Sequence, residues 1–482
     1  MMPMIRRLLA STLVATLLTA APARGADQPL AAKLDALVQK LAPPESHVGI
    51  SVVSLGTGKP LYEREANKLF VPASLQKLAT ASAALTMLGT QRRFTTRLLT
   101  EGNVDGGVLH GHVYLRGEGD PTLEAADLDG MAAKLKAQGV RRISGDLVAD
   151  AAFFQPEGRG AQGWAWDDLS QAYGAPVSAL SLHRNTLDVA IAPGARPGLP
   201  LGMTITPGTN YIQVQNRTTT QAAGAEASLG LDVGPASGGA WQEVLAVKGG
   251  LPVGAGQTVE HLAVAEPVRY TVTYMKEALN RSGIAVDGQI RLGGTPAGAR
   301  AVAQHASPML ADVVRDMLKE SDNMLAETLL LHLGMRGKGG AGTWDKGLRT
   351  LGEFLTKAGW QADGYRLSDG SGLSRYDQVS PAMLARLLTY MPTQPVGYPA
   401  LLIALPVAGV DGTLANRLNT PVTKGHLRAK TGTMSGVSGL AGYLETADGQ
   451  SLVVVIMTNG FVGPATRSRQ LQDAVVEALA AG

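Results

Sequence analysis

Residues 72–77 read Pro-Ala-Ser-Leu-Gln-Lys and open an Ala-rich segment that continues to about Leu88. The high helix propensity of Ala and Leu predicts a helix from Leu75 to Leu88, with Ser74 at its N-terminal end. The helix dipole stabilises developing negative charge there, and residues three positions apart share one helix face, so the Lys77 amine can reach the Ser74 hydroxyl. A buried lysine beside another cation gives up its proton readily and can act as a general base. Taken alone, this Ser-x-x-Lys pair is equally well explained by a routine helix cap.

A second short motif, Ser321-Asp322-Asn323, lies between two predicted helices at 309–319 and 324–332. Ser, Asp and Asn are all good residues for capping the helix that follows, so the motif also has a purely structural explanation.

A third motif, Lys430-Thr431-Gly432-Thr433, ends a predicted strand. A glycine weakens a strand interior because it has no side chain to pack, so its presence needs a reason. Gly432 therefore indicates either the close approach of a ligand backbone or a bulge in the strand.

Strand-like segments occur near both ends of the chain. They are rich in β-branched residues and bounded by Gly-rich turns: His47–Ser54, Pro60–Glu65, Arg428–Thr433, Ser438–Glu445 and Leu452–Thr458. Helical patterns dominate between 304 and 390, and another helix follows the last strand. Because strands at the two ends of a chain commonly meet in one antiparallel sheet, we expect a discontinuous α/β domain built from residues 27–94 and 304–482.

The segment 95–303 has a different texture, with short β-type runs separated by Gly, Pro and Asp turns. One such run, Tyr270–Tyr274, predicts a strand, and helices are predicted at Leu128–Gln138 and Tyr274–Ser282. We therefore expect a β-rich insertion over 95–303, with a smaller lobe nested within it at about 185–262.

Composition excludes several classes of protein. The 482 residues carry 43 Lys and Arg against 40 Asp and Glu, a formal net charge of +3, which is too small for a broadly basic nucleic-acid-binding protein. The chain has no cysteine, which excludes disulfide scaffolds, thiolate metal sites and cysteine nucleophiles.

The first 26 residues have the pattern of a secretory signal peptide. Arg6 and Arg7 precede an apolar run, Leu8–Ala20, which is too short to span a bilayer comfortably, and Ala21-Pro22-Ala23 fits a small-x-small cleavage site. An uncleaved N-terminal anchor is the alternative. No later segment has the roughly 18 uninterrupted apolar residues of a membrane helix.

In this order, and in helix, loop and strand contexts, the three motifs are the signatures of penicillin-recognising serine enzymes. The chain resembles the class C low-molecular-mass penicillin-binding proteins, the D-alanyl-D-alanine carboxypeptidase/endopeptidase family of the penicillin-binding protein 4 type (peptidase family S13). The resemblance covers nearly the whole chain after residue 26. It also includes 94–96, Gly119–Leu123, Trp164–Asp168 and Asp369–Arg375.

The resemblance implies a multi-domain α/β fold: a β-lactamase/transpeptidase-like domain, an antiparallel sheet flanked by helices, that carries a large β-rich insertion. It implies a serine D-Ala-D-Ala carboxypeptidase and D,D-endopeptidase that acts on peptidoglycan stem peptides and cross-links in the periplasm, and that β-lactams acylate. Ser74 would be the nucleophile, Lys77 its base and Ser321 a proton relay to the leaving amine. The expected substrate-binding residues are Asn323, Lys430, Thr431, Gly432, Thr433, Asp168, Tyr173 and Arg375.

The backbone N–H groups of Ser74 and Thr433 would form the oxyanion hole. No cofactor, metal or nucleic acid is expected, and the oligomeric state is left open. Two alternatives remain: a β-lactamase or esterase on the same scaffold, and a non-catalytic peptidoglycan-binding protein. A class A β-lactamase would also need a glutamate loop between the second and third motifs, and the sequence offers no convincing candidate.

Overall fold

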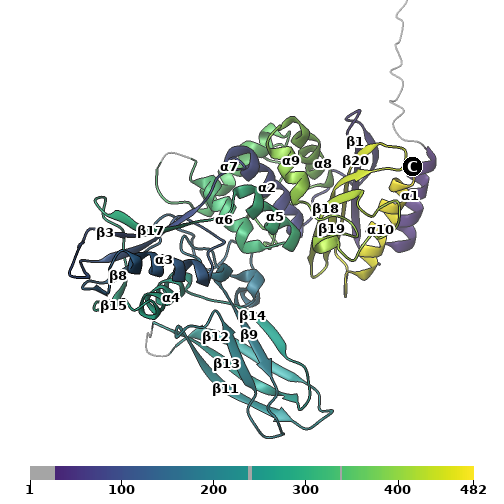
Figure 1. The fold of residues 1–482 in the computed structure, drawn as a ribbon. Helices are drawn as coiled ribbons and strands as arrows, with labels where there is room; N and C mark the ends of the chain where they lie inside the picture. Colours follow the sequence, from purple (N-terminus) through teal and green to yellow (C-terminus); the bar gives the residue numbers. More distant parts are fainter. Residues whose placement is uncertain (1–27, 237–240, 337–338) are drawn as a thin grey trace, which may run out of the picture.

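The computed structural model describes residues 28–236, 241–336 and 339–482. The predicted signal peptide, residues 1–26, lies outside the described residues. The described chain has a mixed α/β architecture in which two sheet-and-helix bodies flank a group of helices, and a narrow β-lobe extends from one of them (Figure 1). Over these residues, the helices are too short or too polar to cross a membrane.

A five-stranded antiparallel sheet joins the two ends of the chain (Figure 1). Its strands, in the order in which they lie, are β18 (Leu427–Met434), β19 (Val437–Glu445), β20 (Ser451–Asn459), β1 (His47–Ser54) and β2 (Pro60–Arg64). Strand β1 pairs with β20 over its whole length, so strands from opposite ends of the sequence lie side by side. Strand β18 stands at the edge of the sheet.

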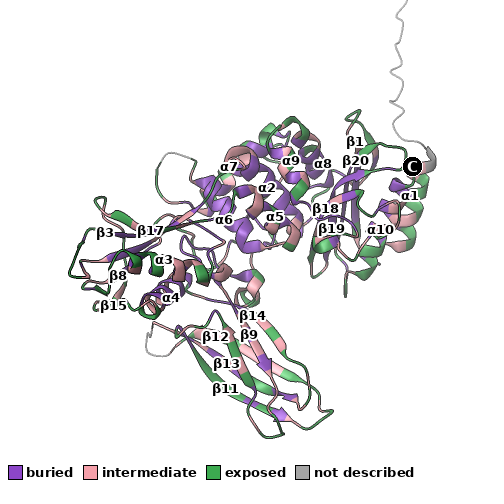
Figure 2. Ribbon diagram, in the orientation of Figure 1, coloured by how far each residue is buried: buried purple, intermediate pink, exposed green. Residues whose placement is uncertain are grey.

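Helices cover both faces of this sheet. On one face lie α1 (Gln28–Leu41) and α10 (Thr466–Ala480), which share a core with Val454 and Ile456 of β20. The alternate residues Val453, Val455 and Met457 belong to a second core, on the other face. The helices of that second core are α2 (Gln76–Met87), α5 (Leu310–Glu320), α6 (Asn323–Gly334), α7 (Trp344–Lys357), α8 (Pro381–Tyr390) and α9 (Gly397–Ala404). Burial on both faces accounts for the nearly continuous apolar sequence of β20 (Figure 2).

The segment between β3 (Thr95–Thr100) and β17 (Arg300–Ala306) folds around a core of its own. These two strands pair with each other, so the chain enters and leaves the segment at one place. The remaining strands of their sheet are β6 (Val113–Gly117), β8 (Leu147–Asp150) and β16 (Ile290–Leu292). A smaller sheet contains β4 (Asn103–Asp105), β5 (Val108–His110), β7 (Arg142–Ile143) and β15 (Ala285–Val286), and the associated helices are α3 (Ala125–Ala137) and α4 (Pro267–Arg281).

A β-lobe projects from this inserted region and is more exposed than the rest of the chain (Figures 1 and 2). One of its sheets contains β9 (Thr186–Ala192), β10 (Gly202–Thr206) and β14 (Thr258–Ala263), and the other contains β11 (Ile212–Gln221), β12 (Ser228–Pro235) and β13 (Glu243–Pro252). The expected boundary at 94/95 lies just before β3, whereas the one at 303/304 falls inside β17, whose residues pair with β3 as far as Ala306. The domain boundaries, and the nested lobe expected at about 185–262, remain predictions.

One secondary-structure prediction is wrong. Tyr270–Tyr274 belongs to helix α4, although its β-branched and aromatic residues favour a strand. Pro267 at the first helical turn and the burial of Tyr270, Tyr274 and Ala278, four residues apart, explain the helix. Packing of one helical face overrides the weak local preference for a strand.

Candidate active site

The three sequence motifs meet where α2, the α5–α6 link and β18 come together. Ser74 lies in a 3-10 turn, Ala73–Leu75, that leads directly into α2, and Lys77 follows one turn later. The Lys77 Nζ atom lies 3.0 Å from Ser74 Oγ and 2.5 Å from Asn323 Oδ1. Its third contact is the Ser371 carbonyl, at 2.8 Å. The amine that could take the Ser74 proton is therefore held from three directions.

The second lysine occupies the opposite side of the second motif. Lys430 Nζ donates to Ser321 Oγ at 2.9 Å and to the Thr431 carbonyl at 2.7 Å. Both lysine side chains are fully buried. Ser321 thus hydrogen-bonds to Lys430, while Asn323, two residues on, hydrogen-bonds to Lys77.

Burial lowers the proton affinity of both lysines. It lowers the pKa of Lys77 to about 8, against the opposing charges of Asp369, Asp322 and Glu327. The pKa of Lys430 lies well below its ordinary value because of burial and then the charge of Lys77. The expected readiness of Lys77 to lose its proton is thus supported, and burial rather than a neighbouring cation is its main cause.

The backbone beside the nucleophile is strained. Ala73, directly before Ser74, and Ser321 both have left-handed φ values, 47° and 64°, which cost a non-glycine residue free energy and commonly mark functional sites. A Cβ atom on Gly372 would stand 1.9 Å from the Ala73 carbonyl oxygen. The turn that carries Ser74 is therefore enclosed by neighbouring backbone.

The structure gives Gly432 a different reason from the two that the sequence indicates. Strand β18 pairs with β19 in unbroken register, so no bulge occurs. A Cβ atom on Gly432 would lie 2.9 Å from the Pro72 carbonyl oxygen and 3.1 Å from the Ser74 nitrogen. The close approach that the structure shows is made by the chain's own backbone at the nucleophile.

A cleft of about 360 Å³ opens above Ser74. Its walls include the predicted residues Asp168, Tyr173, Ser321, Asn323, Arg375 and Thr433, and also Gly372, Leu373, Met434 and Ser435. These last four were not predicted as site residues, although Gly372 and Leu373 lie within the segment Asp369–Arg375, and Met434 and Ser435 directly follow the third motif. Lys77, Lys430 and Gly432 are buried behind this surface.

The structure places Thr431 away from the cleft. Its hydroxyl donates to Thr413 Oγ1 at 2.8 Å, and alternate residues of a strand point to opposite sides. The third motif therefore presents one of its two threonines, Thr433, to the cleft.

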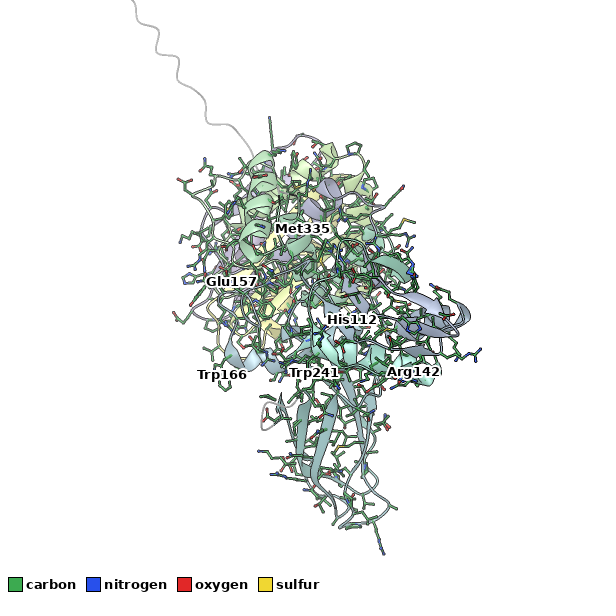
Figure 3. The ribbon with its side chains drawn as sticks, turned by 90° about the vertical axis from the view of Figure 1, so that its left-hand side faces the viewer. His112, Arg142, Glu157, Trp166, Trp241 and Met335 are labelled. Atoms are coloured by element: carbon green, nitrogen blue, oxygen red, sulfur yellow. The ribbon has the colours of Figure 1, made fainter. Side chains whose placement is uncertain are left out.

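The inserted region contributes one wall of the cleft. Tyr173 Oη donates to Asp168 Oδ1 at 2.8 Å, and burial followed by this hydrogen bond raises the pKa of Tyr173 to about 12. The Tyr173 carbonyl accepts a hydrogen bond from Asn323 Nδ2 at 2.8 Å, which ties this wall to the second motif. Trp166 lies at the outer edge of the same segment and points away from the molecule (Figure 3).

Arg184 makes a further link between the insertion and the second motif. It stands in a turn of three consecutive left-handed residues, His183–Asn185, and its Nη1 donates to Asp322 Oδ2 at 3.0 Å. The other Asp322 oxygen caps α6 by accepting from the Leu325 N–H at 2.8 Å. Sequence alone gave no indication of Arg184, because the contact joins segments more than a hundred residues apart.

No group of three or more His, Asp or Glu side chains in the described ranges is arranged to hold a metal ion. The arrangement instead suits nucleophilic chemistry: a serine at the start of a helix, an amine within proton-transfer distance, and a second hydroxyl beside a second amine.

Comparison with known proteins shows the family to which the chain is similar. The family model described as "D-Ala-D-Ala carboxypeptidase 3 (S13) family" matches residues 30–481. A D-alanyl-D-alanine carboxypeptidase of Actinomadura sp. (strain R39) is 38% identical over 463 residues, which is 93% of this chain and 84% of that protein. The crystal structure of penicillin binding protein 4 (dacB) from Haemophilus influenzae is similar with a TM-score of 0.84 at 28% identity, covering 93% of this chain and 99% of that one. Its complex with a novel β-lactam gives 0.79 at 27% identity over the same shares.

Proposed function

The chain belongs to the D-Ala-D-Ala carboxypeptidase 3 (S13) family, and on this premise we propose how its residues divide the reaction. It is a serine-type D-Ala-D-Ala carboxypeptidase on a β-lactamase/transpeptidase-like α/β fold. The observation that carries the assignment of roles is the 3.0 Å contact between Ser74 Oγ and a fully buried Lys77 amine.

Acylation begins when the neutral Lys77 amine takes the Ser74 proton. Ser74 Oγ then attacks the carbonyl carbon of the penultimate D-Ala, forming a C–O bond and a tetrahedral oxyanion. The backbone N–H groups of Ser74 and Thr433 receive this oxyanion, each such donor contributing roughly 3 kcal/mol to the transition state. As the C–N bond breaks, the proton passes from Lys77 through Ser321 to the leaving D-Ala amine.

Deacylation returns the enzyme to its starting state. Water attacks the acyl carbonyl, its proton returns through Lys77 to Ser74, and the shortened peptide leaves. The same steps on a cross-linked peptide release a second peptide in place of D-Ala, which makes the chain a D,D-endopeptidase as well. β-Lactams resemble the D-Ala-D-Ala end and acylate the same Ser74.

Substrate binding is assigned to the edge of the sheet. Strand β18 is an edge strand, so residues 430–434 can pair with an extended peptide, as in β-strand addition. Asn323 holds the substrate backbone, and the Thr433 hydroxyl with the field of Lys430 receives the terminal carboxylate. We do not extend the carboxylate role to Thr431, because its hydroxyl is engaged by Thr413. Gly432 serves by keeping β18 close to Ser74.

Asp168, Tyr173 and Arg375 form the proposed contact to the side chain of the substrate's diamino acid. All three line the cleft beside Ser74, and Asp168 and Arg375 offer opposite charges to a group that carries both an amine and a carboxylate. The substrates are then peptidoglycan stem peptides and cross-links. The proposed location is the periplasm, reached through the leader expected at residues 1–26.

Release of D-Ala from a peptide ending in D-Ala-D-Ala tests the proposal. The wild type should release D-Ala, and Ser74→Ala should release none while retaining its fold. Undiminished release by Ser74→Ala would reject the assignment of the nucleophile.

Nitrocefin separates the nearest alternative, a β-lactamase. Glu327, which lies between the second and third motifs, is fully buried and does not line the cleft, so it cannot serve as a water-activating glutamate there. We therefore expect a slowly cleared acyl-enzyme, and rapid continuous turnover of nitrocefin would favour the β-lactamase. Absence of both D-Ala release and a β-lactam adduct would favour the non-catalytic alternative.

A further inference from the structure

Three carboxyl side chains are fully buried behind Lys77, and the reaction described above uses none of them. They belong to Glu327 on α6 and to Asp369 and Asp377, which flank the segment 370–376. Burying a carboxyl group without a partner is costly, so a cluster of three beside a catalytic amine requires an explanation.

The segment 370–372 follows the first turns of α2 closely. The Ser371 carbonyl accepts from Lys77 Nζ at 2.8 Å, and the Gly370 carbonyl accepts from Thr80 Oγ1 at 2.7 Å. Gly372 stands against the Ala73 carbonyl with no room for a side chain. Any movement of residues 370–372 would therefore move the Ser371 carbonyl, to which the Lys77 amine donates.

Asp369 fixes one side of this segment. Its Oδ1 accepts from the Gly372 N–H at 2.7 Å, and its Oδ2 accepts from the Ser374 N–H at 2.7 Å and from Trp164 Nε1 at 2.9 Å. The Ser371 hydroxyl donates to the same Oδ2 at 3.2 Å. All four neighbours are donors, which is the surrounding that suits a carboxylate anion.

Glu327 fixes the other side. It accepts from the Ser371 N–H at 2.8 Å, from the Gly370 N–H at 3.0 Å and from Trp344 Nε1 at 2.9 Å. The Ser371 carbonyl that accepts from Lys77 therefore lies between two held N–H groups. Glu327 accepts from the N–H of Ser371, and Asp369 accepts from the N–H of Gly372.

We propose that Asp369 and Glu327 are positioning residues for acylation: this buried acid pair aims the Ser371 carbonyl at Lys77 and supplies the negative charge that stabilises its ammonium form. When Lys77 takes the Ser74 proton, the new cation is fully buried, and its stability depends on nearby anions. The inference rests on the proposed function, because it assigns the acids to the base of that reaction.

The charged groups around Lys77 come from three elements. Asp369 in the 368–374 segment, Asp322 at the start of α6 and Glu327 on α6 all raise the pKa of Lys77 against the larger effect of its burial. Lys430 on β18 is the facing cation. Removing a negative charge from this set lowers the pKa of Lys77.

Burial raises the pKa of both Glu327 and Asp377. Burial and then the charge of Asp369 raise the pKa of Glu327 to about 7, so it gains its negative charge as the pH rises through neutrality. Burial and then the charge of Asp369 raise the pKa of Asp377 well above its ordinary value. Asp377 provides a matched control, because it is equally buried but is not among the acids whose charge acts on Lys77.

The test measures the rate of acylation by benzylpenicillin as a function of pH, by intact-mass spectrometry of the full chain. Only neutral Lys77 accepts a proton, so the wild-type rate should rise with pH and level off above about pH 8. In Asp369→Asn the midpoint of this rise should move down by about one pH unit, and in Glu327→Gln by less. Asp377→Asn should keep the wild-type midpoint.

An equal loss of rate at every pH, with an unmoved midpoint in both variants, would reduce the acids to structural supports and overturn the inference. Circular dichroism establishes that each variant is folded. If Asp369→Asn does not fold, the double variant Glu327→Gln/Trp344→Phe takes its place. The Trp344→Phe change removes the indole N–H that the new amide would face. The pH midpoint of the double variant then decides the question. Failure of the wild type to form any adduct would instead reject the proposed function.

Discussion

The two walls of the cleft differ in how far their side chains are exposed to solvent. The wall formed by α2, β18 and the 368–374 segment holds Lys77 and Lys430 at 0% exposure, with a dense set of hydrogen bonds behind them. The wall formed by the inserted region presents side chains such as Tyr173, which is 50% exposed. Electrostatic effects are strong where water is excluded and weak where it is present. We call the first the dry wall and the second the wet wall: the dry wall can change the proton affinity of its lysines, while the wet wall carries residues that we propose contact the substrate's side chain.

Lys77→Met should have the largest effect, because it removes the base from the dry wall while filling most of the same space. We expect the acylation rate by benzylpenicillin to fall by at least about 10³-fold, as general-base loss commonly does. Mass spectrometry of the adduct gives the rate, and circular dichroism reports the fold. A folded variant that still acylates at the wild-type rate would exclude Lys77 as the base.

Gly432→Ala should have the next largest effect, since a methyl group there meets the backbone on either side of Ser74. A displacement of the nucleophile by a few tenths of an ångström should slow acylation by about 10- to 100-fold. Overpacking should also lower the free energy of unfolding by about 1–3 kcal/mol. Gly234 in β12 is the matched control, because no atom lies within 4 Å of its added Cβ. Equal effects at the two glycines would contradict this reading of β18.

Arg184→Ala tests one of the two described contacts between the inserted region and the second motif. Loss of the hydrogen bond to Asp322 should loosen the α5–α6 link and slow acylation by roughly threefold to tenfold. Glu320→Ala removes the other partner of Arg184 and leaves the link to Asp322, so it should keep nearly the wild-type rate. If both variants acylate at the same rate, the hydrogen bond between Arg184 and Asp322 does not support the second motif.

Asp168→Ala should have the smallest and most selective effect. Benzylpenicillin carries no diamino acid, so its acylation rate should stay within about twofold of the wild type. Hydrolysis of diaminopimelate-containing peptides should fall by about two- to fivefold relative to lysine-containing ones, as expected for a partly exposed polar contact. An unchanged ratio would remove Asp168 from substrate recognition.

The same division explains how far the sequence could predict the molecule. The end strands and the helix after Ser74 follow from local propensity and apolar patterning, and β1 was predicted with its observed bounds. The three motifs could be recognised because each is short and local, and their order is specific. Helix α4 was missed at Tyr270–Tyr274, because packing on one helical face outweighs a β-type composition.

What sequence reasoning missed depends on contacts between distant segments. Glu327 reads as an ordinary helical residue until the fold brings the Gly370 and Ser371 N–H groups to it. The reason for Gly432 lies in a backbone that is more than 350 residues away in the chain, as its distances to Pro72 and Ser74 show. Arg184 likewise meets Asp322 only after the insertion has folded against the rest of the chain.

Peptide mapping of the benzylpenicillin adduct tests the central assignment most directly. We expect a single covalent adduct on the wild-type chain, located on Ser74 and missing from Ser74→Ala. An adduct on another residue, or an undiminished adduct on Ser74→Ala, would contradict it.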